Sequence, residues 1–214
     1  MWFMDVADIA HVVRSLGRPT HLVGHSKGGG QATDAARAEP DRVIKLVNID
    51  GFGPPALPDG DRPVPVRCAE FFEARRRLAQ RRDWRPYKTF EDLVERRRAQ
   101  NPRLTAEWLR YFAFHGGRSA SDGWRWKSDP FMANGFGPWQ PEWIAPSYRT
   151  LRVPMLAITG SEPDTWGPLP EAILAERLSH VPQLERCTIR GAGHFVHLER
   201  PRETADAILD FLGH

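Results

Sequence analysis

Cysteine is scarce in this chain, which has 214 residues and contains only Cys68 and Cys187. A thiolate metal site needs closely spaced pairs such as CxxC, and a disulfide-rich fold needs several cysteines. Neither pattern is present, so we expect reduced thiols, as is typical of the cytoplasm. No pattern of residues calls for a metal ion or an organic cofactor.

Long apolar runs are also absent, and the mean hydropathy is −0.51. A membrane-spanning helix needs about 20 consecutive apolar residues. The first eight residues include Asp5 and Asp8 and lack the positive charge that opens a secretory signal. We therefore expect a soluble, cytoplasmic protein without a membrane partner.

The excess of positive charge is small, at +3, but arginines cluster at 75–77, 81–82 and 96–98. Such clusters are one signature of nucleic-acid binding. Acidic residues are interleaved with them, however, and ion pairs at helical spacing explain the pattern. We expect no nucleic-acid partner.

Strand-like and helix-like segments alternate in the two outer parts of the chain. The apolar patterns and stop signals predict helices over 5–16, 27–39, 171–180 and 202–212, and strands over 20–25, 43–49, 153–160 and 184–189. A strand, a helix and a second strand in this order imply parallel pairing with a right-handed crossover. The predicted fold class is α/β, with a mostly parallel sheet of about four strands.

The middle of the chain, residues 53–149, differs in composition from the core at 1–52 and 150–214. Loops rich in proline and glycine alternate there with helical stretches at about 66–82, 90–100 and 105–115. Six of the eight tryptophans also lie in this part. We interpret it as an inserted helical cap.

The pattern G-x-S-x-G occurs as Gly24-His25-Ser26-Lys27-Gly28, between a predicted strand and a predicted helix. A serine there stands on a sharp, strained turn that exposes its hydroxyl. Glycines two residues to either side would avoid collisions between Cβ atoms. Ser26 is therefore the predicted nucleophile.

A serine hydroxyl needs a base to take its proton. His194 follows Gly191-Ala192-Gly193 in the loop between the last predicted strand and the last predicted helix, so it is the predicted base. His25 and His197 lie close in sequence to these two residues. We expect both to line the substrate pocket.

The imidazole in turn needs a carboxylate that fixes its tautomer. Ligands and catalytic groups collect at the carboxyl ends of parallel strands, and the loop after the strand 153–160 offers Glu162 and Asp164. We favour Asp164 and keep Glu162 as the alternative, with Trp166 of the same loop in the pocket. Asp50, before Gly51, is the outsider, since a turn-forming role explains it.

Three segments, HLVGHSKGG, VPMLAITGSEPD and GAGHFVHLERP, resemble the nucleophile elbow, acid-bearing strand and histidine loop of the α/β-hydrolase superfamily. The resemblance is to its capped group of esterases, carbon–carbon bond hydrolases, haloalkane dehalogenases and epoxide hydrolases. The last two use aspartate as nucleophile, so Ser26 argues against them. The resemblance implies an acyl-enzyme route, with the backbone N–H of Lys27 as an oxyanion donor.

Members of that superfamily also carry several strands and a second oxyanion donor before the helix that begins here at about Asp5. We therefore expect this chain to be a fragment of a longer enzyme, or the product of a mis-started reading frame. The strand 20–25 would then have an open edge, through which two copies would associate.

The predicted function is hydrolysis of a small carboxylic ester or a related acyl compound by Ser26, His194 and Asp164. Two alternatives stay open: hydrolysis of a carbon–carbon bond, and a truncated, non-catalytic α/β-hydrolase fold used for binding.

Overall fold

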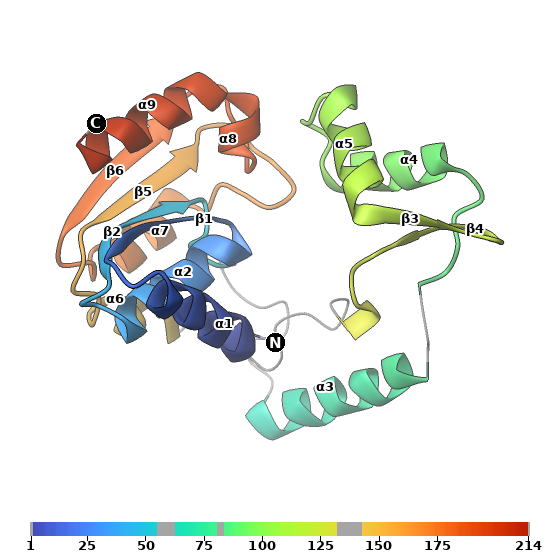
Figure 1. Cartoon of the computed structure of the whole chain (residues 1–214), viewed down its shortest axis with the longest axis horizontal. Coiled ribbons are helices and arrows are strands. Elements are labelled where there is room, and N and C mark those ends of the chain that lie inside the picture. The colour runs from blue at the N-terminus through green and yellow to red at the C-terminus, as the bar shows by residue number, and fades with distance from the viewer. Residues whose placement is uncertain (1, 55–62, 81–83, 132–142, 214) are drawn as a thin grey trace. The chain divides into compact units, whose positions relative to one another are not determined.

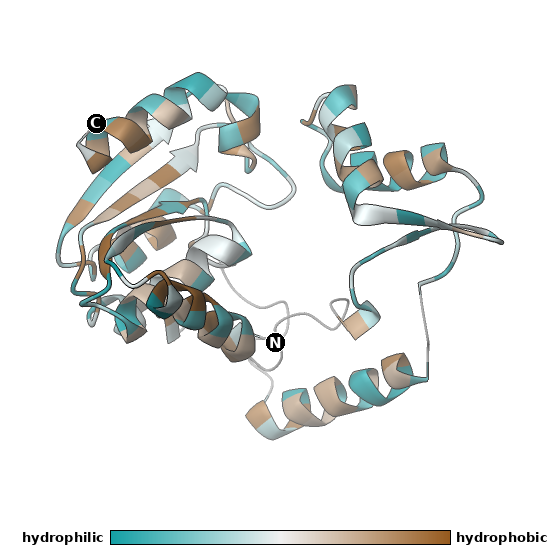
Figure 2. Cartoon of the chain, viewed as in Figure 1, coloured by the Kyte–Doolittle hydropathy of each residue, from teal (hydrophilic) through white to brown (hydrophobic). Residues whose placement is uncertain are grey.

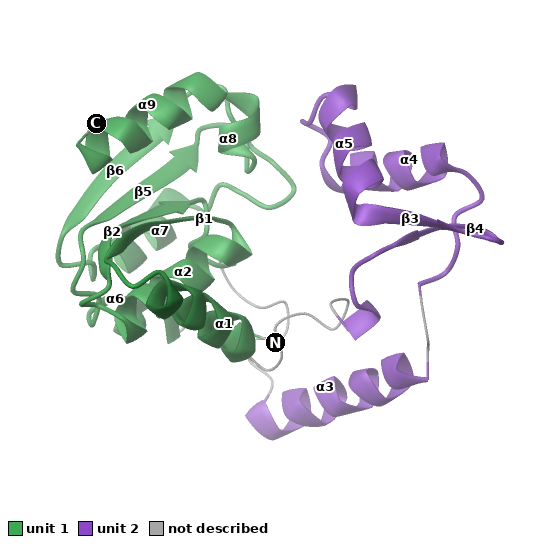
Figure 3. Ribbon diagram, viewed as in Figure 1, with its two compact units in different colours: residues 1–58, 140–214 green, residues 59–139 purple. Residues whose placement is uncertain are grey.

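The computed structural model describes residues 2–54, 63–80, 84–131 and 143–213. The chain divides into two compact units (Figure 3). The first unit comprises residues 1–58 and 140–214, and the second comprises residues 59–139. The second unit is thus shorter than the predicted cap at 53–149, by six residues at its start and ten at its end. That the second unit is a cap over the site stays a prediction.

A four-stranded parallel sheet forms the centre of the first unit (Figure 1). Its strands are β1 (Thr20–His25), β2 (Val43–Ile49), β5 (Met155–Gly160) and β6 (Leu184–Ile189), in the spatial order β1-β2-β5-β6. His25 pairs with Ile49, and Ile49 pairs with Ile158, so the carboxyl ends of three strands lie level with one another. The predicted α/β fold class is confirmed.

Helices cover both faces of this sheet because its central strands are apolar on both sides. Val47, Ile49 and Ile158 share a core cluster with Phe211 of α9 (Pro201–Leu212). Asn48 lies between Val47 and Ile49 in the strand, so its side chain points to the opposite face of the sheet. There it donates a hydrogen bond to Thr33 of α2 (Lys27–Ala38). This alternation is that of a strand buried on both faces.

The remaining helices of the first unit complete these layers. They are α1 (Trp2–Ser15), α6 (Ile144–Tyr148), α7 (Glu171–Leu178) and α8 (Val196–Glu199). The short α6 and α8 were not predicted, because four or five residues are too few to show a helical period. Along α9, apolar and hydrophilic residues alternate as expected for a helix with one buried side (Figure 2).

In its described residues, 63–80 and 84–131, the second unit contains three helices and a hairpin. The helices are α3 (Val64–Ala79), α4 (Phe90–Gln100) and α5 (Ala106–Gly116), close to the predicted stretches. The hairpin pairs β3 (Gly117–Ala120) with β4 (Gly123–Trp126) in antiparallel fashion. It was not predicted, because its strands are short and partly polar; the Asp122-Gly123 dipeptide was the available turn signal.

At one edge of the described sheet lies β1, on which Val23 is 50% exposed. Association of two copies through this edge stays a prediction. In the described part of the chain, no helix has the length and apolarity that crossing a bilayer requires.

Candidate active site

Ser26 lies on the turn that joins β1 to α2. Its backbone has φ 54° and ψ −124°, a conformation that costs free energy for any residue with a side chain. Hydrogen bonds hold the turn: Ser26 N donates to the Ile49 carbonyl at 2.9 Å, and the Ser26 carbonyl accepts from Gly29 N at 2.9 Å. This is the sharp strand–turn–helix geometry that the sequence predicts for the nucleophile.

Glycine is required on both sides of this turn, but not at both predicted positions. A Cβ on Gly24 would overlap the backbone of Gly28, and a Cβ on Gly29 would overlap the side chain of Asn48. A Cβ on Gly28 would meet open space. The steric argument therefore holds for Gly24, and on the helix side it applies to Gly29 rather than to Gly28.

His194 lies in the loop between β6 and α8, and its ring reaches Ser26. The distance from His194 Nε2 to Ser26 Oγ is 2.9 Å. His194 is only 5% exposed. The structure thus brings together the two residues that are 168 positions apart in the sequence.

The carboxylate on the other side of the ring belongs to Asp50, which directly follows β2. Asp50 Oδ2 lies 2.7 Å from His194 Nδ1, and both side chains are 6% exposed. A carboxylate only accepts hydrogen bonds, so Nδ1 carries the proton and the lone pair of Nε2 faces the Ser26 hydroxyl. Asp50, the outsider of the sequence analysis, therefore occupies the place expected for Asp164.

Asp164 contacts His194 through the main chain instead. Its Oδ2 accepts a hydrogen bond from His194 N at 3.0 Å, and its Oδ1 accepts one from Thr165 N at 2.6 Å. Glu162, the alternative acid, has its Oε1 2.9 Å from Ser161 Oγ, from which it accepts a hydrogen bond. The structure thus places neither predicted acid on the imidazole ring.

The sequence feature that could have identified Asp50 is its position directly after a strand, not the residues beside it. It stands at the carboxyl end of a central strand, just as the loop with Asp164 does, and β2 and β5 are adjacent. Asp50 also has a positive φ of 49°, and the Asn48 side chain accepts from Gly51 N at 2.9 Å to hold that turn. The expected turn at Asp50-Gly51 is present, and the Asp50 carboxylate on it contacts His194.

Two further histidines lie near His194. The His25 ring lies 4.7 Å from the His194 ring and 4.6 Å from the His197 ring. Burial, followed by the nearby His194, lowers the pKa of His25 to about 3, and burial also lowers the pKa of His197. Both rings are therefore neutral at neutral pH. Trp166, on the loop after Asp164, is 62% exposed. That these three residues line a substrate pocket stays a prediction.

Lys27 begins α2, and its side chain turns towards α1. Its Nζ lies 2.6 Å from Asp5 Oδ2, which also accepts a hydrogen bond from Gln31 at 2.7 Å. These two donors lower the pKa of Asp5. The backbone of Lys27 is in the first turn of a helix, where N–H groups attract negative charge.

In the described ranges of the chain, no group of three or more His, Cys, Asp or Glu residues has an arrangement that would hold a metal ion. Around Ser26, the described side chains form a hydrogen-bonded series from Asp50 through His194 to the Ser26 hydroxyl.

The family model for the alpha/beta hydrolase family matches residues 3–207. The chain belongs to the alpha/beta hydrolase family. The predicted resemblance is thereby confirmed, and with it the prediction of a hydrolase-type enzyme.

Named relatives include a 2-(acetamidomethylene)succinate hydrolase from Mesorhizobium japonicum, which is 29% identical over 210 residues. That match covers 96% of this chain and 68% of the relative. The crystal structure of an E-2-(acetamidomethylene)succinate hydrolase superposes with a TM-score of 0.73 at 26% identity, over 98% of this chain and 72% of that one.

A thioesterase domain from the curacin biosynthetic pathway has a similar fold. Its TM-score is 0.77 at 21% identity, over 98% of this chain and 72% of that domain.

The two glycines of the elbow give a matched test of its steric constraint. Gly29→Ala should lower the free energy of unfolding by about 1–3 kcal/mol, because the new methyl group overlaps Asn48 and forces the turn to shift. Gly28→Ala should leave stability unchanged or slightly raised. Urea unfolding checks both variants, and equal losses at the two positions would contradict the account.

Burial of neutral His25 predicts a dependence of stability on pH. Its pKa is lower in the folded state than the ordinary value of 6.5, so the unfolded chain binds the extra proton. The contribution of His25 to the free energy of unfolding is therefore fully present above about pH 6.5. It is lost as the pH falls, by at most about 1.4 kcal/mol per pH unit. In urea titrations between pH 7 and 4, His25→Gln should flatten this loss; an unchanged slope would contradict it.

Proposed function

We propose that this protein is a serine hydrolase that cleaves a carboxylic ester, or a related small acyl compound, through an acyl-enzyme. The observation that carries the proposal is the unbroken chain of contacts from Asp50 to His194 to Ser26, at 2.7 Å and 2.9 Å. It is a nucleophile, a base and an orienting carboxylate in the order that acyl transfer needs.

The first half of the reaction forms the acyl-enzyme. Ser26 Oγ attacks the carbonyl carbon of the substrate while His194 Nε2 takes the hydroxyl proton. His194 then carries a positive charge, which the Asp50 carboxylate stabilises across the Nδ1–H bond. The imidazolium next gives the proton from Nε2 to the leaving alcohol oxygen, and the carbon–oxygen bond of the ester breaks.

The second half repeats these steps with water. His194 takes a proton from the water molecule, the hydroxide oxygen attacks the acyl carbon, and Ser26 regains its proton as the acid product leaves. In both halves the carbonyl oxygen becomes negative. The backbone N–H of Lys27, at the start of α2, is the donor that we assign to this oxyanion.

Amide hydrolysis is the second candidate, and one comparison favours it. The 29% identical relative is named for a substrate with an acetamido group. The same three residues can cleave an amide if His194 protonates the leaving nitrogen. Hydrolysis of a carbon–carbon bond stays the third candidate, for which the proton would go to carbon.

Labelling with a fluorophosphonate probe tests the proposal. Folded protein should become labelled on Ser26, as located by peptide mass spectrometry, and Ser26→Ala should abolish labelling without changing thermal stability. A panel of p-nitrophenyl esters and N-acetyl amides then ranks the substrate classes. Folded protein that neither takes the label nor hydrolyses any substrate would support the binding-only alternative and defeat the proposal.

The roles of the three carboxylates are separated by replacing each with its amide. Asp50→Asn should lower kcat by about 10⁴-fold, because the amide no longer stabilises the imidazolium or holds its tautomer. Glu162→Gln, on the same side of the sheet, is the control and should lie within about two-fold of the parent. A loss of 10⁴-fold in Asp164→Asn, with Asp50→Asn active, would return the acid role to Asp164.

A further inference from the structure

The main chain of His194 is hydrogen-bonded on both sides by side chains from other elements. Its N–H donates to Asp164 Oδ2 at 3.0 Å, and its carbonyl accepts from His25 Nε2 at 2.9 Å. One partner lies in the loop after β5, and the other is the last residue of β1. Neither contact involves the ring that does the chemistry.

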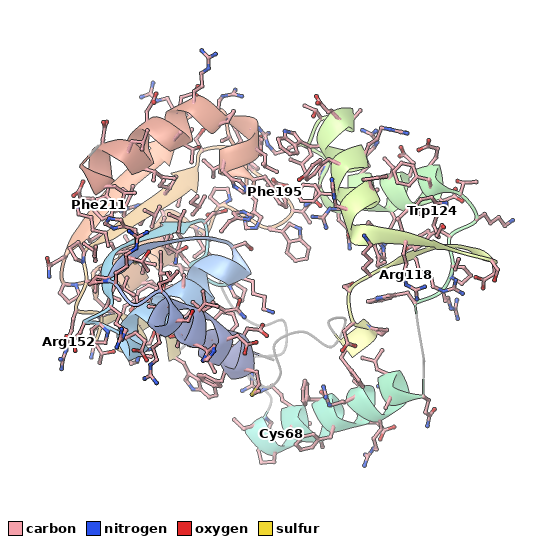
Figure 4. The ribbon with its side chains drawn as sticks, viewed as in Figure 1. Cys68, Arg118, Trp124, Arg152, Phe195 and Phe211 are labelled. Atoms are coloured by element: carbon pink, nitrogen blue, oxygen red, sulfur yellow. The ribbon has the colours of Figure 1, made fainter. Side chains whose placement is uncertain are left out.

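His25 is held in the form that this contact requires. A carbonyl oxygen only accepts hydrogen bonds, so His25 Nε2 must carry a proton. The ring packs against His194 and His197, and against Phe195 with a centroid distance of 5.0 Å (Phe195 is labelled in Figure 4). A ring packed in this way cannot easily leave the carbonyl.

The loop before His194 is tied down in the same manner. Gly191 N donates to Ser161 Oγ at 2.9 Å, and Gly193 N donates to Glu199 at 3.0 Å. The end of β5 touches this loop so closely that a Cβ on Gly160 would overlap the carbonyls of Ala192 and Gly193. The contacts of Asp164 and His25 continue this series to the residue that carries the imidazole.

We propose that His25 and Asp164 are positioning residues that hold the main chain of His194 between them, so that its ring meets Asp50 and Ser26 at once. This inference rests on the proposed function. It gives Asp164 a role through its acceptor oxygen rather than its charge, and it gives His25 a role through its N–H donor. A displacement of about 1 Å in a catalytic group costs on the order of 10²-fold in rate.

The donor role of His25 is tested by two variants of similar size. His25→Leu removes the N–H and should lower kcat by about 10- to 100-fold with little change in KM, because the base is misplaced while the substrate still binds. His25→Gln offers an amide N–H at a similar reach and should recover most of that loss. A rise in KM alone, or no recovery with glutamine in folded protein, would overturn the role.

The acceptor role of Asp164 is tested in the same way. Asp164→Asn keeps an oxygen for the His194 N–H and should lose far less kcat than Asp164→Leu, which should fall by about 10- to 100-fold. Equal losses in the two variants would show that the charge matters and would overturn the inference. Thermal unfolding verifies that each variant is folded.

Fluorophosphonate labelling separates this inference from the proposed function. If Ser26 of the parent protein is labelled, and the leucine variants are labelled at the parental rate, positioning by these residues is wrong while the hydrolase proposal stands. If folded parent protein is not labelled at all, the proposed function itself fails.

Discussion

The imidazole of His194 must satisfy two partners at once, and the first unit of the structure is arranged around that constraint. Asp50 binds one ring nitrogen and Ser26 faces the other. The three residues follow β2, β6 and β1, and they meet only because those strands are parallel and end at the same side of the sheet (Figure 1). The apolar β2 and β5, packed between helices, keep that edge in place.

Much of this arrangement could be predicted from the sequence, because local patterns encode it. The strands 20–25, 43–49 and 184–189 have the predicted limits, since each is a short run rich in apolar or β-branched residues and bounded by turn residues. Ser26 and His194 stand out in the same way, because Ser26 lies between Gly24 and Gly28 and His194 follows Gly191 and Gly193 in the loop after a strand. The β3–β4 hairpin lacked such a pattern and could be found only from its turn.

The choice between Asp50 and Asp164 could not be made in this way, because it depends on tertiary packing. Both follow adjacent parallel strands, and both carboxylates touch His194. Asp50, on a turn with positive φ, meets the ring, whereas Asp164 meets the main-chain N–H, and spacing along the chain does not report this difference. Asp50 both forms the turn and presents its carboxylate to the ring, so a turn-forming role does not exclude the contact with His194.

The protonation of the His194 ring is the most direct measure of the central contact. In protein with ¹⁵N-labelled histidine, we expect neutral His194 to carry its proton on Nδ1, and Asp50 to protect this proton from exchange. The resonance of this Nδ1 proton should disappear in Asp50→Asn and persist in Asp164→Asn. A proton found on Nε2 instead, or a signal lost only when Asp164 is replaced, would contradict it.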